Sequence, residues 1–144
     1  MYNFITFSII NQNSIFMNTK SFLVSGLVAF LVYYLLGALF YGFLFTDLYP
    51  TGGEENMVFI AVGCFFYAFL LAYVLTVVSS VKSAAEGFKI GAIFGLLNAL
   101  SMNFFMYASL EPNYQNIAID SLLSLVMVGI TGSVIALIHK KLDA

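Results

Sequence analysis

Four long apolar stretches, separated by short polar links, make up most of this chain. A helix needs about 20 mostly apolar residues to cross a hydrocarbon core of roughly 30 Å. Four stretches reach this length, and Asp120 is the only charged residue inside any of them: residues 22–45, 57–81, 90–110 and 117–138. The pattern therefore predicts four membrane-spanning helices within a membrane domain of residues 20–141.

The links between these stretches are short and contain residues that are typical of turns. Pro50 is followed by Thr-Gly-Gly in the first link, and Pro112 precedes Asn113 in the third. Short links force consecutive helices to run antiparallel. The sequence therefore predicts an all-α fold, a four-helix transmembrane bundle with up-down-up-down topology.

All basic residues are lysines, and all of them fall on one side of the predicted bundle. They precede the first span, lie in the link between the second and third, or follow the fourth: Lys20, Lys82, Lys89, Lys140 and Lys141. The other two links carry only acidic charges. Positive residues are retained in cytoplasmic loops, so we expect both termini to be cytoplasmic, in the plasma (inner) membrane of a bacterial cell.

The first 19 residues form an uncharged N-terminal tail that is too short and too polar to span a membrane. Two interpretations stay open. In the first, Met17 is the true initiator and residues 1–16 are a mis-called extension. In the second, residues 1–16 are a real tail that is disordered or lies at the membrane interface. The apolar run after Lys20 is too long for a signal peptide, so we expect it to remain as the first span.

Composition agrees with a membrane protein and disfavours several other classes. The chain is 62% hydrophobic and 8% charged, whereas soluble domains are roughly a quarter charged. The lipid bilayer is therefore the expected surrounding, and nucleic acid is not an expected partner. Cys64 is the only cysteine, and His139 has no second histidine or cysteine with which to form a metal site. We expect no enzyme activity, no cofactor and no metal, and we interpret His139 as an anchor at the cytoplasmic interface.

The third span contains a repeat of small residues. Gly87, Gly91, Gly95 and Ala99 recur every four positions, which leaves a narrow groove where another helix backbone approaches closely. A looser small-residue face follows in the fourth span, at Gly129, Gly132 and Ser133. These faces predict helix packing, either inside the bundle, which we favour, or between subunits.

Asn98 lies at the middle of the third span. An unpaired carboxamide in hydrocarbon costs several kcal/mol, so we expect Asn98 to pair with a group of another span. Tyr33, Tyr34 and Tyr67 lie at similar depth by residue count. The sequence therefore predicts a central polar layer in which Asn98 bonds one of these hydroxyls.

Asp120 is the strongest functional candidate, since an ionisable residue within a span is a functional hypothesis by default. Asn103 on the third span and Tyr41 on the first fall near the same depth as Asp120. We expect Asp120 to face the bundle or its outer mouth, within reach of Asn103 or Tyr41. It is either a polar cap of the bundle or a proton- or ligand-linked site.

Short motifs occur in every span: Gly-Ala-Leu-Phe-Tyr at 37–41, Ala-Tyr-Val-Leu at 72–75, residues 91–95 and 98–105, and Ile119-Asp120 with Gly129. Together they resemble a family of small bacterial four-helix membrane proteins catalogued as a domain of unknown function. The resemblance covers residues 18–138 and implies the four-helix architecture, with Asn103 and Asp120 singled out. The chain lacks the tryptophan that this family often places after the glycine of the first span.

Two functions are compatible with these features. The first is a non-enzymatic membrane protein, acting as a scaffold or a partner subunit, as a homo-oligomer or with another membrane protein. The alternative is a small transporter or channel subunit in which Asp120, Asn103 and Asn98 line a polar path. A path requires these side chains to converge, whereas a scaffold needs only local pairing.

Overall fold

A computed structural model describes residues 18–48, 55–77, 81 and 83–142. Residues 1–17 lie outside the described part, so both interpretations of the N-terminal tail stay predictions. The described residues form α1 (Thr19–Leu39), the π-helix η2 (Phe40–Leu44), α2 (Met57–Val77), α3 (Ala84–Tyr107) and α4 (Tyr114–Leu142). They contain four helices long and apolar enough to cross a membrane, which confirms the all-α prediction and indicates a multi-pass membrane protein.

The helix ends differ from the predicted spans because capping residues set them. Asn18 caps α1 by accepting a hydrogen bond at its Oδ1 from the Ser21 amide, at 3.3 Å. In the same way the Ser83 hydroxyl accepts from the Glu86 amide at 3.3 Å. Such caps satisfy amides that the first turn leaves unpaired. As a result, α3 begins at Ala84, well before the apolar run itself.

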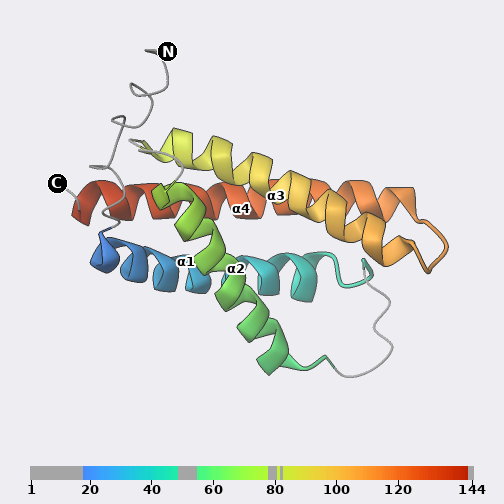
Figure 1. The fold of residues 1–144 in the computed structure, drawn as a ribbon. Helices are drawn as coiled ribbons and strands as arrows, with labels where there is room; N and C mark the ends of the chain where they lie inside the picture. Colours follow the sequence, from blue (N-terminus) through green and yellow to red (C-terminus); the bar gives the residue numbers. More distant parts are fainter. Residues whose placement is uncertain (1–17, 49–54, 78–80, 82, 143–144) are drawn as a thin grey trace, which may run out of the picture.

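The closest pairing in the fold joins α3 to α4, which lie side by side in Figure 1. A Cβ added at Gly91 would overlap the carbonyl oxygen of Val128, and one added at Gly95 would lie 2.6 Å from that of Ser124. Gly87 meets the backbone of Gly132 in the same way. The repeat of small residues therefore packs within the chain, glycine against backbone.

Hydroxyl groups of α4 add hydrogen bonds across this narrow contact. The Ser124 hydroxyl donates to the Gly95 carbonyl at 3.1 Å, and the Ser133 hydroxyl donates to the Ala84 carbonyl at 3.0 Å. Ala99 is buried against the same contact, and Gly129 leaves room for the Phe88 ring. Both small-residue faces thus serve the α3–α4 pair.

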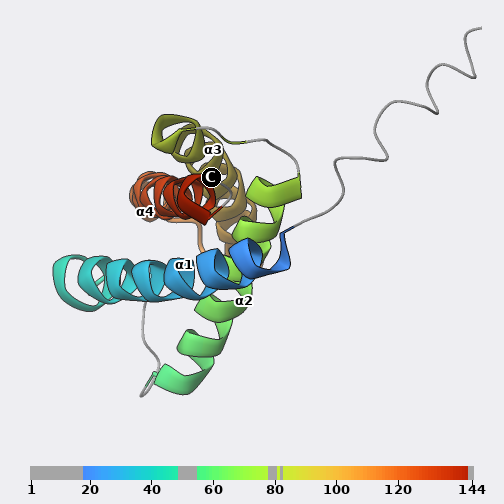
Figure 2. The same ribbon diagram turned by 90° about the vertical axis from the view of Figure 1, so that its left-hand side faces the viewer.

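Helix α2 departs from the regular bundle that the sequence predicts. It crosses α1 steeply and its N-terminal half leaves the other helices, as Figures 1 and 2 show. Small residues allow close approach at the crossing, where Ala29 of α1 and Ala68 of α2 are fully buried. The Phe69 ring occupies the space beside Gly26. Bulky rings on either side of this point, including the pair Phe30–Phe65 at 5.8 Å, hold the two helices at a wide angle.

Helix α4 is the centre of the fold, because α1, α2 and α3 all contact it. Figure 2 shows α4 between α3 and α1. The apolar core lies where α1, α2 and α4 meet, and its largest members are Leu71, Leu75, Val128 and Ile135. This arrangement gives α4 two polar neighbourhoods, one near each of its ends.

Candidate functional site

Asp120 lies near the N-terminal end of α4 and is held by two other elements. Its Oδ1 accepts a hydrogen bond from the Tyr41 hydroxyl of η2 at 2.7 Å. Its Oδ2 accepts one from Nδ2 of Asn103 in α3, at 2.5 Å. Only 6% of the Asp120 surface is exposed. The structure therefore brings together three of the four predicted polar residues, Asp120, Asn103 and Tyr41, with the carboxylate facing the bundle.

The orientation of Asn103 is fixed by a second bond. Its Nδ2 also donates to the Ala99 carbonyl, one helical turn earlier, at 2.8 Å. An amide nitrogen carries two hydrogens, and here one goes to Ala99 and one to Asp120. Since Asn103 is buried as well, the carboxylate receives a rigid donor that cannot turn to solvent.

Tyr41 reaches Asp120 from the only π-helical segment among the described residues. The bond that closes this segment runs from the Phe45 amide to the Phe40 carbonyl, at 2.7 Å. This i to i+5 pattern is rare in proteins as a whole, and the segments that have it are often found at functional sites. The chain that follows is tied back to α4, where Nδ2 of Asn116 donates to the Leu48 carbonyl at 3.1 Å.

A cavity of about 180 Å³ lies on the other side of Tyr41. Its wall comes mainly from α1, η2 and the N-terminal half of α2, and includes the polar side chains of Tyr33, Tyr34, Glu55 and Cys64. Tyr41 therefore contacts both the buried carboxylate and this cavity. Asp120 itself does not line the cavity.

Asn98 is placed differently from the expectation. It is exposed on α3, and no hydrogen bond to it occurs within the described part of the chain. The predicted bond to Tyr33, Tyr34 or Tyr67 is therefore absent there, and the central polar layer does not form. Tyr67 instead stacks on Tyr33, with ring centroids 4.9 Å apart.

A second polar cluster, which the sequence analysis missed, joins three helices near the opposite end of α4. Nε2 of His139 lies 3.0 Å from the Ser25 hydroxyl of α1 and 3.3 Å from the Thr76 hydroxyl of α2. His139 is thus part of the helix packing and not only an interface anchor. A serine near the start of the first predicted span and a threonine near the end of the second were the available signal.

Both hydroxyls beside His139 also bond to their own helices. The Ser25 hydroxyl lies 3.1 Å from the Phe22 carbonyl oxygen, and the Thr76 hydroxyl lies 2.6 Å from the Ala72 carbonyl oxygen. Each hydroxyl has a single hydrogen, so a hydroxyl that donates to its carbonyl accepts from the imidazole. In the tautomer with its proton on Nε2, His139 donates to such an oxygen.

Replacing His139 with leucine is expected to destabilise the chain by about 1 kcal/mol, because one shared hydrogen bond is lost while Ser25 and Thr76 keep their carbonyl bonds. His139→Gln retains a nitrogen donor on a side chain of similar reach and should recover part of this loss. Unfolding in mixed detergent, followed by circular dichroism, measures the difference. Equal stability of His139→Leu and His139→Gln would show that the Nε2 hydrogen bonds contribute nothing to the free energy of unfolding.

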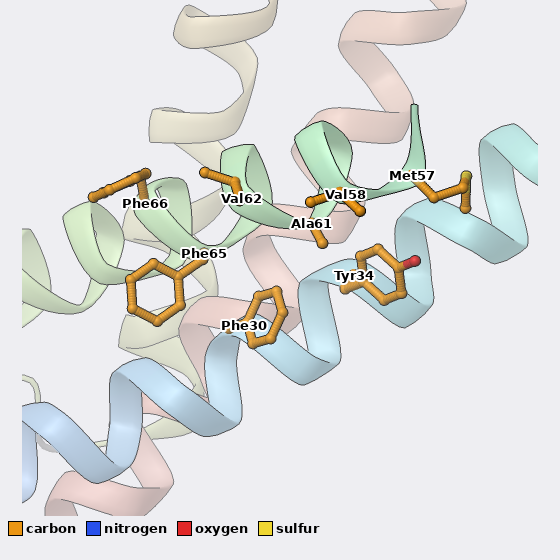
Figure 3. A pocket seen from close by; sticks show the side chains of 8 residues that line it. All are labelled: Phe30, Tyr34, Met57, Val58, Ala61, Val62, Phe65 and Phe66. Atoms are coloured by element: carbon orange, nitrogen blue, oxygen red, sulfur yellow. The ribbon is translucent and has the colours of Figure 1, made fainter. Parts of the chain in front are cut away.

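An open apolar groove of about 670 Å³ runs between α1 and the N-terminal half of α2. Figure 3 shows the side chains of Phe30 and Tyr34 from α1 facing those of Ala61 and Phe65 from α2 across it. Nothing in this lining provides a charge or a reactive group. Its composition suits lipid acyl chains, which fill such surfaces in a bilayer.

Comparisons of this chain with protein-family models, with curated proteins and with solved structures find no match. The resemblance to the small bacterial four-helix family therefore stays a prediction. The features of the chain that bear on its function are the two polar clusters and the surfaces between them.

Proposed function

We propose that this chain is a non-enzymatic integral membrane protein that acts as a scaffold or partner subunit. The observation that supports this most directly is the separation of the two polar clusters. Asp120 and His139 are nineteen residues apart on α4, about 28 Å along a helix axis. This is close to the thickness of a hydrocarbon core, so each cluster suits one boundary of the membrane.

The layer between the clusters is packed and apolar. Leu71, Leu75, Val128 and Ile135 there are at most 1% exposed. Thr131 is fully buried at the same level, and its hydroxyl donates a hydrogen bond to the Met127 carbonyl at 2.8 Å. Polar groups that pair locally at both ends, with a closed layer between them, favour a structural bundle over a path through one chain.

The proposed orientation places both termini in the cytoplasm, with the helices alternating in direction across the plasma membrane. The start of α1, the start of α3 and the end of α4 lie together at one end of Figure 1. These segments contain Lys20, Lys89, Lys140 and Lys141. Their grouping supports a cytoplasmic face by the positive-inside rule, and the Asp120 cluster then belongs to the outer boundary.

A second candidate, a proton- or ligand-linked transporter or channel subunit, is favoured by one specific observation. Tyr41 donates to the buried carboxylate and also lines the outer cavity. A ligand entering the cavity therefore has a direct route to Asp120 through a single hydroxyl. Asn98 does not contribute to this site, so the candidate rests on Asp120, Asn103 and Tyr41.

Two variants separate the candidates in a deletion strain that is profiled for metabolites, ions and lipids. A scaffold depends on bundle shape, so Asp120→Asn should restore the wild-type profile and Gly91→Val should fail to restore it. A linked site depends on the ionisable group, so Asp120→Asn should fail although it is expressed and folded. The latter result would overturn the scaffold proposal.

A further inference from the structure

Asn98 occupies an unusual place for a polar side chain. It lies near the middle of α3 (Ala84–Tyr107), yet it is exposed and has no hydrogen bond among the described residues. Ser101, which is one turn further along, is also exposed. Met102 and Phe105 share this side of the helix and are 62% and 74% exposed. We call Asn98, Ser101, Met102 and Phe105 the Asn98 face.

The bilayer makes such a face unfavourable when it is left bare. Asn98 is too far from either end of its helix to reach headgroup water with a short side chain. A carboxamide transferred into hydrocarbon without a hydrogen-bond partner costs several kcal/mol. Helix α4 covers another side of α3, and no described residue bonds to Asn98, so a second chain in the bilayer is a source of the missing partner.

We propose that the Asn98 face is a dimerisation surface, and that its occupant is a second copy of this chain. A carboxamide contains both a donor and an acceptor. Two copies related by a two-fold axis therefore satisfy each other, Nδ2 of each Asn98 donating to Oδ1 of the other. Such an isologous contact closes on itself and needs no second kind of surface.

The rest of the face suits this contact. Ser101 lies beside Asn98 and has a hydroxyl that both donates and accepts, so it is self-complementary as well. Met102 and Phe105 supply apolar area around the polar pair, and methionine adapts readily to irregular contacts. The total charge on the face is zero, so two identical copies meet without repulsion. The dimer goes beyond the proposed function, because it forms whether Asp120 is a cap or a site.

The first test measures association in liposomes by energy transfer between labelled copies over a range of protein-to-lipid ratios. The wild-type chain should dimerise, and Asn98→Leu should weaken dimerisation about tenfold, as expected for the loss of interhelical polar bonds. Asp120→Asn is the matched control and should associate like the wild type. A wild-type chain that stays monomeric at every ratio would overturn the proposal, as would an Asn98→Leu variant that dimerises equally well.

The second test locates the contact by cross-linking in a Cys64→Ala background. Ser101→Cys keeps Asn98 and should form a disulfide-linked dimer with a copper–phenanthroline oxidant. Leu122→Cys is the control, because Leu122 is exposed on α4 at a similar distance from the outer end of its helix. Equal cross-linking at both positions would indicate random collision and would contradict the assigned face. Preferential cross-linking through Ser101→Cys supports it.

Discussion

Replacing Gly91 with alanine is expected to destabilise the α3–α4 pair by about 1 to 3 kcal/mol, the usual cost of overpacking. The new methyl group would overlap the Val128 carbonyl oxygen and approach Cα of Gly129 at 3.3 Å. Both are backbone atoms, so no side-chain rotation relieves the contact and the helices must separate. The intrinsic helix preference of alanine over glycine, up to about 1 kcal/mol, is too small to compensate. Gly91→Val should cost more.

Gly63→Ala provides the matched control for this prediction. A Cβ at Gly63, on the exposed side of α2, meets nothing within 4 Å. The same chemical change should therefore be neutral or slightly stabilising there. Unfolding in mixed detergent, monitored by circular dichroism, compares the two variants. If Gly91→Ala were as stable as Gly63→Ala, this result would contradict the close backbone contact between α3 and α4 at Gly91.

Replacing Asp120 with leucine is expected to destabilise the chain by about 2 to 5 kcal/mol. Leucine removes the acceptor of both the Tyr41 hydroxyl and the Asn103 amide, and each buried donor left unpaired costs about 1 to 3 kcal/mol. Tyr41→Phe removes only one of these donors and should cost less. The three variants Asp120→Leu, Tyr41→Phe and their combination form a double-mutant cycle. Strictly additive losses would show that the two groups do not interact.

Asp120→Asn should be much milder, for a reason that the geometry provides. The new amide keeps one oxygen to accept from Asn103, and its nitrogen can donate to the Tyr41 oxygen, which accepts as well as donates. The hydroxyl then reverses its role toward residue 120, and both neighbours keep a hydrogen bond to that side chain. A loss as large as that of Asp120→Leu would show that the negative charge itself holds the cluster together.

Residue counting was sufficient to find the Asp120 cluster. The rise along a helix is constant at about 1.5 Å per residue, so depth in the membrane follows from the distance to a span end. Tyr41, Asn103 and Asp120 lie at matching depths on three spans, and the spacing of the glycines identified the packing side of α3. Asn103 and Asp120 come from adjacent antiparallel helices at comparable distances from the link between the third and fourth spans, and this depth alone placed them near each other before any coordinates were known.

Asn98 shows why the same counting failed elsewhere. A residue advances about 100° around a helix, so a repeat of four winds forward by about 40° at each step. Asn98 lies almost in line with Gly91, but the contact with α4 has already moved around the helix to Ala99 and Asn103 at that depth. The side chain is therefore left outside. To predict the position of Asn98, one needs its depth in the membrane and also the way in which the line of contact with α4 winds around α3.

The His139 cluster and the steep crossing of α2 depend on three helices at once. Ser25 and Thr76 meet His139 only because α1 and α2 both come close to α4 near its C-terminal end. The crossing angle is set by aromatic rings packed around small residues such as Gly26 and Ala29. Each of these features arises from the fit of whole helix surfaces, which the pattern along a single segment does not contain.

The central position of α4 has a consequence for biosynthesis. A ribosome delivers the N-terminal helices first, but α4, which has the most extensive contacts with the other helices, is made after α1, α2 and α3. Until Tyr114–Leu142 emerges, α3 has no partner for its glycines and the Tyr41 and Ser25 hydroxyls have no partner on α4. The inserted segments therefore wait in the bilayer as loosely associated helices, as in a two-stage process of insertion followed by assembly. Completion of the C-terminal span is the event that turns them into one structure.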